Sequence, residues 1–332
     1  MAHPSVTVTV DGTPITGPIL SRLVSLTITD REGIQSDTVE MTFADGPPFV
    51  AAPRRGAVMS VSFSLDGLGV FVGAYVIDRV EFACMPYTIT VKGHSADLRS
   101  AMKTSRSRHW DGASVRSVVE EIARQHDLAA RISDAAARHV YDWLGQQDEA
   151  DLAFLDRLAR RHGALFTIKN QTLLWLERGA GRGVDADLPI VTIPASVIIE
   201  GSCRLSETDV DRFGTVKAFW QNTAAAEREA VVVPADPSAT GEHVLREPFS
   251  SRAEAERAAQ AAAREMQRGL IETSCAIVGR PSLMAGQPIT YSGVRPMVDG
   301  RVFILEMVRH TFTKSSGLRT AFTGKLQAPT LG

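Results

Sequence analysis

The feature that most constrains this chain is the alternation of apolar and polar residues through its first hundred positions. Six stretches show it: residues 6–12, 23–30, 37–43, 57–67, 70–82 and 87–93. Because successive side chains of a strand point to opposite faces of a sheet, this period of two predicts antiparallel strands, and Asp-Gly pairs predict tight hairpin turns. Consecutive short strands leave edges that need closure or a partner, so we expect a small barrel or sandwich in this part of the chain.

A helical pattern follows the alternation. Val115, Val118, Val119 and Ile122 recur at helical spacing, and Ser114 stands where an N-cap serine belongs. A second helix and two short strands are expected next, at residues 148–162, 164–170 and 172–178. This part of the chain is therefore predicted to be a small mixed helix and strand domain, which ends in a glycine-rich linker at residues 178–187.

The second of these helices carries a dense cluster of charges. Its acidic residues are Asp148, Glu149, Asp151 and Asp156, and its basic residues are Arg157, Arg160, Arg161 and His162. Acids at the start and bases at the end suit the helix dipole, Asp156 and Arg160 are spaced for an ion pair, and Gly163 can end the helix. We therefore predict a solvated helix here, and not an acid–base site, since nothing in the stretch indicates burial.

The last third of the chain returns to strand patterns around one long helix. Strands are expected at residues 196–205, 212–222, 271–279, 287–293, 301–313 and 318–326, and a loop at residues 223–250. Ser251 and Glu254 have the spacing of a capping box, and Gly269 stands where a C′ glycine would end the Ala-rich helix at residues 251–269. A second barrel-like β domain is expected, and the β–mixed–β order suggests an ancient duplication.

Only one segment resembles a catalytic motif. Gly93, His94, Ser95, Ala96 and Asp97 approach the G-x-S-x-G nucleophile elbow, although Asp97 replaces the second glycine and the preceding strands form a meander. The other interpretation is a turn in which Ser95 caps a short following helix. A cell-wall hydrolase with Ser95 or a carboxylate as its catalytic group is therefore kept as an alternative function.

Aromatic residues give a second alternative, a carbohydrate-binding β module. It would need Trp110, Trp143 or Trp220 exposed on one face. The trio of His109, Trp110 and Asp111 could bind a ring, but a tryptophan at a domain junction is more often a core anchor. Glu120 and Glu121 point in different directions on a helix, so they are not a glycosidase pair by themselves.

Other chemistry finds little support in the sequence. Cys84, Cys203 and Cys275 are odd in number and far apart, so we expect three buried, reduced thiols, and neither a disulfide framework nor a metal site. The nucleotide-binding and zinc motifs are missing, a net charge of −2 does not favour a nucleic-acid platform, and we expect no cofactor. Without a secretory signal pattern or a long apolar run, the chain is expected to be a soluble protein made in the cytoplasm. This largely negative result favours a part of an assembly.

The order of segments along the chain resembles the late control D family, the baseplate hub proteins of contractile phage tails. The resemblance lies in residues 73–82, 87–128, 146–177 and 279–326 and in the Ala-rich helix after Ser251. It spans nearly the whole chain from about residue 70, whereas the first seventy residues agree in strand pattern only. No single motif is diagnostic, but the ordered set is.

This resemblance implies a non-enzymatic protein with two tail-tube-like β-barrel domains, at residues 1–105 and 188–332, flanking the mixed domain at residues 106–187. Three copies would form a pseudo-sixfold ring in the tail baseplate, assembled in the host bacterial cytoplasm. Its implied partners are the sixfold tail tube or a tube initiator, a trimeric spike, the tape measure protein and baseplate wedge proteins. Related hubs in type VI secretion are fused to their spike; because this chain stops at Gly332, its spike is expected to be separate. DNA would pass through the bore without specific binding, so we expect an acidic lumen.

Overall fold

The computed structural model describes residues 4–65, 68–95, 101–169, 171–181, 188–208, 212–222 and 225–327. The first part of the chain forms antiparallel strands, as expected. These are β1 (Ser5–Val10), β2 (Thr13–Pro14), β3 (Leu23–Arg31), β4 (Thr38–Ala44), β5 (Val58–Leu65), β6 (Leu68–Cys84) and β7 (Tyr87–Ser95), with the short helix α1 (Gly17–Leu20) before β3. Asp11 and Gly12 both have positive φ, at 47° and 78°, which is the conformation that an Asp-Gly hairpin turn requires.

The middle part contains two helices and five strands. They are β8 (Ser105–Ser114), α2 (Val115–Gln125), β9 (Ala129–Ile132), β10 (Val140–Ala150), α3 (Asp151–Arg161), β11 (Ala164–Lys169) and β12 (Thr172–Glu177). The Ser114 hydroxyl accepts from the Ser117 N–H at 3.0 Å, so the predicted N-cap is confirmed. The antiparallel pair β8–β10 was not predicted, and it moves the start of α3 from Asp148 to Asp151.

The last part differs most from the sequence prediction. Its strands are β13 (Val191–Pro194), β14 (Arg204–Glu207), β15 (Thr215–Asn222), β16 (Glu227–Pro234), β17 (Glu242–Phe249), β18 (Ile271–Val278), β19 (Pro288–Ser292), β20 (Val302–Thr313) and β21 (Gly317–Leu326). The predicted loop at residues 223–250 contains β16 and β17, and the predicted strand at 196–205 is largely a 3₁₀ turn and coil. The loop prediction failed because β16 and β17 are stabilised by tertiary contacts, packing with β15 against the helix α4 (Arg252–Gly269).

The capping of α4 is confirmed at its start and wrong at its end. The Ser251 hydroxyl accepts from the Glu254 N–H at 3.2 Å. The return bond of the capping box goes from the Ser250 N–H to Glu254 Oε2, one residue earlier than expected. Gly269 is the last helical residue and does not have positive φ, because the chain continues through Leu270 in a right-handed conformation into β18.

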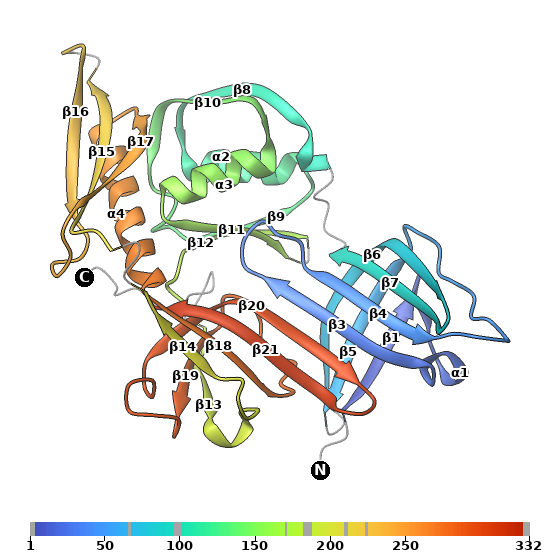
Figure 1. Ribbon diagram of the computed structural model, residues 1–332. Helices are drawn as coiled ribbons and strands as arrows, with labels where there is room; N and C mark the ends of the chain where they lie inside the picture. The colour runs from blue at the N-terminus through green and yellow to red at the C-terminus, as the bar shows by residue number, and fades with distance from the viewer. Residues whose placement is uncertain are drawn as a thin grey trace.

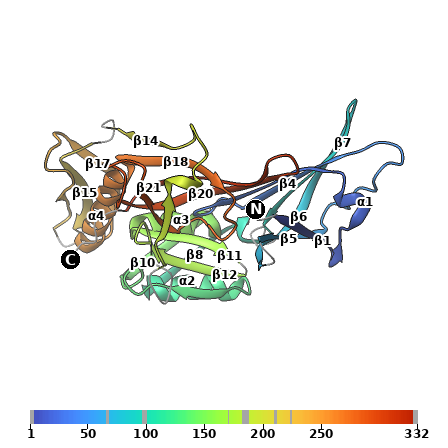
Figure 2. The ribbon, with the colours of Figure 1, turned by 90° about the horizontal axis from the view of Figure 1, so that it is seen from below.

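A single 13-stranded sheet joins the two ends of the chain (Figure 1). Antiparallel pairing of β3 with β20, in the register Leu26–Phe312 and Ile28–His310, connects the first strands to the last. In Figure 2 this sheet is seen nearly edge-on, with α2, α3 and their strands on one side and α4 at one end. Within the described residues the strand order runs open from β14 to β2, so closure into barrels is not observed.

Four apolar clusters form the core. One lies among β1–β7, one within the middle part, one among β13 and β18–β21, and one between α4 and the sheet of β15, β16 and β17. The last third of the chain therefore has two cores where the sequence suggested one. Among the described helices, none is long and apolar enough to cross a bilayer.

Candidate functional site

A cavity of about 720 Å³ lies where the two ends of the sheet meet the middle part. Its lining includes Tyr75 and Ser95 from the first strands, Lys169 from β11, and His310 from β20. The Ser95 and Thr167 hydroxyls that border it are buried and make no hydrogen bond. The cavity brings buried polar side chains from all three parts of the chain together, so it is the first place to look for chemistry.

A charged cluster at the cavity links all three parts of the chain. The Lys169 ammonium donates to Asp30 Oδ1 at 2.5 Å and to Asp37 Oδ2 at 2.6 Å. Asp30 also accepts from the Ala285 N–H at 2.8 Å. Burial raises the pKa of Asp37 to about 6, and although burial opposes it, the two carboxylates raise the pKa of Lys169. A lysine held charged in this way is a structural tie and not a nucleophile.

The hydrolase hypothesis placed a nucleophile at Ser95. Ser95 lies at the end of β7 with its side chain buried beside the sheet core, and not on an exposed elbow. The neighbouring His94 points to the other face and pairs with Asp78, while the His310 nitrogens bond Thr320 and the Leu283 carbonyl. No base therefore contacts the Ser95 hydroxyl among the described residues. Residues 96–100, where Ser95 was expected to cap a helix, lie outside them.

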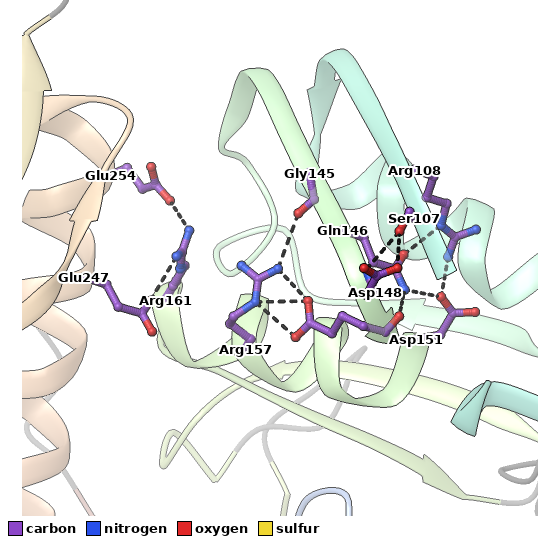
Figure 3. Close-up of polar contacts among 11 residues, drawn as sticks. Ser107, Arg108, Gly145, Gln146, Asp148, Asp151, Arg157, Arg161, Glu247 and Glu254 are labelled. Atoms are coloured by element: carbon purple, nitrogen blue, oxygen red, sulfur yellow. Dashed lines mark hydrogen bonds and ion pairs between the residues drawn. The ribbon is translucent and has the colours of Figure 1, made fainter. Parts of the chain in front are cut away.

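The charged stretch around α3 contains a fully buried carboxylate, contrary to the sequence prediction (Figure 3). Asp151 accepts from Arg108 at 2.5 Å, from Gln146 at 2.8 Å and shares a 2.8 Å contact with His126. Burial alone would raise its pKa, but the hydrogen bonds from His126 and Gln146 and the charge of Arg108 lower it. Because its oxygens have partners from β8, from β10 and from the residue that follows α2, Asp151 fixes how these elements pack.

A second buried polar cluster joins α3 and β10 to α4. The Tyr141 hydroxyl contacts His162 Nε2 at 2.8 Å and donates to Glu254 Oε1 at 2.9 Å. Arg161 bridges the same carboxylate, at 3.3 Å, and Glu247 at 2.9 Å, as Figure 3 shows. Burial lowers the pKa of His162 to about 3, so the imidazole is neutral and acts as a structural partner. The capping residue of α4 is thus also a link between two units.

The rest of the predicted α3 helix is as expected. Asp156 and Arg160 form the i,i+4 ion pair at 2.6 Å, and Gly163 ends the helix with positive φ. Arg157 binds Glu149 at 2.7 Å. The network of Asp151 was missed because its partners come from positions far apart in the sequence, and only the unusual run of acids before α3 could have indicated it.

The tryptophans do not form one exposed face. Trp110 is the predicted core anchor: it is buried, stacks on Phe154 at 5.2 Å and donates to Glu121 at 2.8 Å. Trp143 is 61% exposed, and Trp220 is half-buried against the separate core of α4. A lone exposed ring does not make the aromatic platform that the carbohydrate-binding alternative needs. Glu120 pairs with Arg116 and so does not face the same way as Glu121.

Only one of the three cysteines is buried as predicted. Cys275 is buried and Cys203 half-buried, but Cys84 is exposed because it ends β6 at a hairpin. In the part of the chain that the structure describes, no group of three His, Cys, Asp or Glu residues is arranged to hold a metal ion.

Comparison with known families gives one consistent answer. The model of the phage tail baseplate hub (GPD) family matches residues 35–316. The chain is 28% identical over 356 residues to a protein of Escherichia phage P2 described as a probable baseplate hub protein, covering 94% of this chain and 90% of that one. A counterpart from Escherichia phage 186, described in the same way, is 25% identical with the same coverage.

Solved structures share the fold at much lower identity. The 43 kDa tail protein of prophage MuSo2 from Shewanella oneidensis superposes with a TM-score of 0.71 at 12% identity, over 96% of this chain and 97% of that one. The tail protein from Neisseria meningitidis MC58 gives 0.69 at 15% identity, over 97% and 96%. The E. coli c3393 protein, a type VI secretion component, gives 0.58 at 13% identity, over 96% and 76%.

Proposed function

The chain belongs to the phage tail baseplate hub (GPD) family, and we propose that it forms a homotrimeric ring that joins the tail tube to the central spike. Membership of this family gives it a structural role at the baseplate of the tail. The Ser95 hydroxyl makes no hydrogen bond, so no base among the described residues supports it as the nucleophile of the hydrolase alternative.

The observation that carries the proposal is the pairing of β3 with β20. It joins β1–β7 to β13, β14 and β18–β21 in one sheet, and we propose that these strands belong to the two tube-like units expected at residues 1–105 and 188–332. Two such units in each chain would give six in a trimer, which matches the symmetry of a sixfold tube. A heterologous interface that closes after three copies makes a ring without open ends.

The ring would also protect the free edges of the sheet. In one chain the described order ends at β2 on one side and at β14 on the other, and an unpaired edge strand tends to bind another strand. We therefore place contacts between neighbouring copies near these edges. The trimeric spike would bind one side of the ring, and the tube or its initiator the other, with the tape measure and wedge proteins near them.

DNA would pass through the bore of the ring. Carboxylates lining the bore would repel phosphates and prevent sticking, although the chain as a whole has a net charge of only −2. An image of the assembled ring with a basic lumen would refute this part of the proposal. Assembly in the host cytoplasm before virion release completes the proposed sequence of events.

The native mass of the purified chain tests the ring. For a chain of 35.9 kDa we expect a species of three chain masses by native mass spectrometry or light scattering, either alone or after addition of the spike protein. A chain that stays monomeric at every concentration and with the spike present would overturn the ring. If a trimer is found, images of it should show a sixfold-like face.

A further inference from the structure

We propose that Cys203 and Cys275 are a modification site: they form a reversible disulfide that clamps the base of the α4 unit (β15, β16, β17 and α4, residues 212–269). In the chain this unit is inserted between β14 and β18, and Figure 1 shows it beside the middle part, above these two strands. Cys203 directly precedes β14, and Cys275 lies within β18. The two thiols therefore stand at the two stems through which the chain enters and leaves the α4 unit.

The pairing of the two strands places the cysteines opposite each other. Arg204 pairs with Ser274 in the antiparallel register, so one further step sets Cys203 across from Cys275. On the other side of the pair, the Ser202 hydroxyl donates to the Ala276 carbonyl at 2.9 Å and accepts from its N–H at 3.1 Å. Neighbours on both sides thus hold the two cysteines face to face.

The position in the hydrogen-bond ladder suits a disulfide. The Thr208 N–H donates to the Leu270 carbonyl, and counting from this bond puts the cysteines at a non-hydrogen-bonded position. There, Cα atoms lie about 4.5 Å apart and the two side chains project from the same face. A disulfide spans Cα distances of about 4.4–6.8 Å, so no large backbone movement is needed.

The surroundings of the pair determine how it would react. Both sulfurs pack in the same apolar cluster, with Cys275 only 3% exposed and Cys203 half-buried. Burial, with the neighbouring Cys203 thiol, raises the pKa of Cys275 to about 12. The thiolate is the attacking form, so the more accessible Cys203 meets an oxidant first and Cys275 reacts second.

The reaction balances with a low-molecular-weight disulfide as the oxidant. The Cys203 thiolate attacks this disulfide, expels one thiolate and forms a mixed disulfide. Cys275 then loses its proton, attacks the Cys203 sulfur and expels the second thiolate, so both cysteines are oxidised and the oxidant is reduced to two thiols. The cytoplasm keeps such a pair reduced, and an oxidising medium outside the cell closes it. That change of compartment rests on the proposed function, since it requires the protein to leave the cell in a virion.

The test incubates the full chain with oxidised glutathione, alkylates the remaining thiols in denaturant and maps the peptides by mass. We expect a peptide that links Cys203 to Cys275 at a rate that rises with pH, and Cys84, which has no cysteine beside it, either alkylated or carrying glutathione. A Cys84→Ser variant should form the same link. Cys203→Ser and Cys275→Ser should each abolish the link. Only proteins that keep both cysteines should unfold at a higher urea concentration after oxidation, and a reductant should reverse this increase.

Alkylation of both Cys203 and Cys275 after prolonged oxidation would overturn the proposal, as would a Cys84-linked dimer as the sole product. The result is independent of the ring. A monomer that forms the link would refute the trimer and support the disulfide. A trimer in which Cys203 and Cys275 stay reduced would support the ring and refute the disulfide.

Discussion

The long sheet and the middle part of the molecule are stabilised by different kinds of interaction. At the β3–β20 junction, Leu26 and Ile28 are fully buried, and the polar side-chain contact of Thr27 with Thr311 is a weak one at 3.5 Å. In the middle part, a fully buried Asp151 is surrounded by Arg108, Gln146 and His126. Backbone pairing and apolar burial hold this junction of the sheet, whereas the middle part adds to its apolar core a network of hydrogen bonds around a buried charge.

This difference between the two regions predicts which of them tolerates substitutions better. An apolar contact weakens in proportion to the area that is lost, so a sheet residue can be trimmed gradually. When a buried charge loses its hydrogen-bond partners, the full desolvation penalty of that charge is no longer offset. The same holds for buried partners that lose the charge they bind. A single substitution in the buried network of the middle part should therefore lower the free energy of unfolding more than a single substitution in the sheet.

The largest effect is expected for Asp151→Ala. The change leaves Arg108 and His126 with unpaired polar groups beside the core of the middle part. Removing one partner from a buried ionic network costs about 3–5 kcal/mol in the free energy of unfolding. Urea denaturation of the purified variant, followed by circular dichroism, would measure this loss.

Asp156→Ala on the same helix is the matched control. The Asp156 side chain is 16% exposed but pairs with Arg160, which is 67% exposed, so Arg160 can be solvated after the substitution and the loss should be about 0.5 kcal/mol. If the two variants lost the same stability, the buried network would not be what holds the middle part together.

The second effect is a loss of stability in acid that depends on His162. Its pKa is about 3 in the folded chain and about 6.5 when unfolded, because burial first, then His139 and Arg257, disfavour the imidazolium. Between these values the unfolded state binds a proton that the folded state does not, so stability falls as pH falls from about 6.5 toward 3. Unfolding free energies measured across this range should decrease by a few kcal/mol.

A His162→Gln variant should flatten this pH dependence, since glutamine does not titrate. The comparison is the difference in slope between the variant and the original chain, not their absolute stabilities. His109→Gln, which changes a side chain that is 60% exposed, should leave the slope unchanged. If the unfolding free energy of His162→Gln still fell with pH, the pH dependence would have to come from other buried groups, such as His310 in the sheet.

The sheet could be predicted from the sequence more completely than the middle part, and for a physical reason. Alternation is local: the buried pattern of β7, from Ile89 through Val91 to Ser95, can be followed residue by residue in the sequence. The junction of β3 with β20 could not be predicted, because pairing between residues nearly three hundred positions apart leaves no local signal.

The candidate site shows the same contrast. The N-caps of α2 and α4 follow from short-range spacing and were found, as was the core role of Trp110. The buried state of Asp151 depends on partners 5 to 43 residues away, in β8, in β10 and at the end of α2, so the sequence alone predicted a solvent-exposed charge. β16 and β17 were missed because their burial comes from packing with α4.

A third, smaller effect is expected in the sheet. Ile28→Ala removes a fully buried side chain of β3, directly opposite His310, and should cost about 2–4 kcal/mol. Val24→Ala on the same strand, at 47% exposure, should cost less than about 0.5 kcal/mol. Both are measured by urea denaturation. A cost above that of Asp151→Ala would reverse the proposed contrast between the two regions.

The smallest effect is expected at Ser114, where the middle part depends on a local contact that the sequence did predict. Its hydroxyl accepts the Ser117 N–H at 3.0 Å, and Ser114→Ala leaves this first-turn donor of α2 without its partner, at a cost of about 1 kcal/mol. Ser114→Gly should cost only a few tenths of a kcal/mol, since a glycine N-cap lets water reach the same N–H. No loss of stability in either variant, measured by thermal unfolding, would show that α2 is held by the packing of residues such as Val115 and Ile122, and that this local contact is secondary to the core of the middle part.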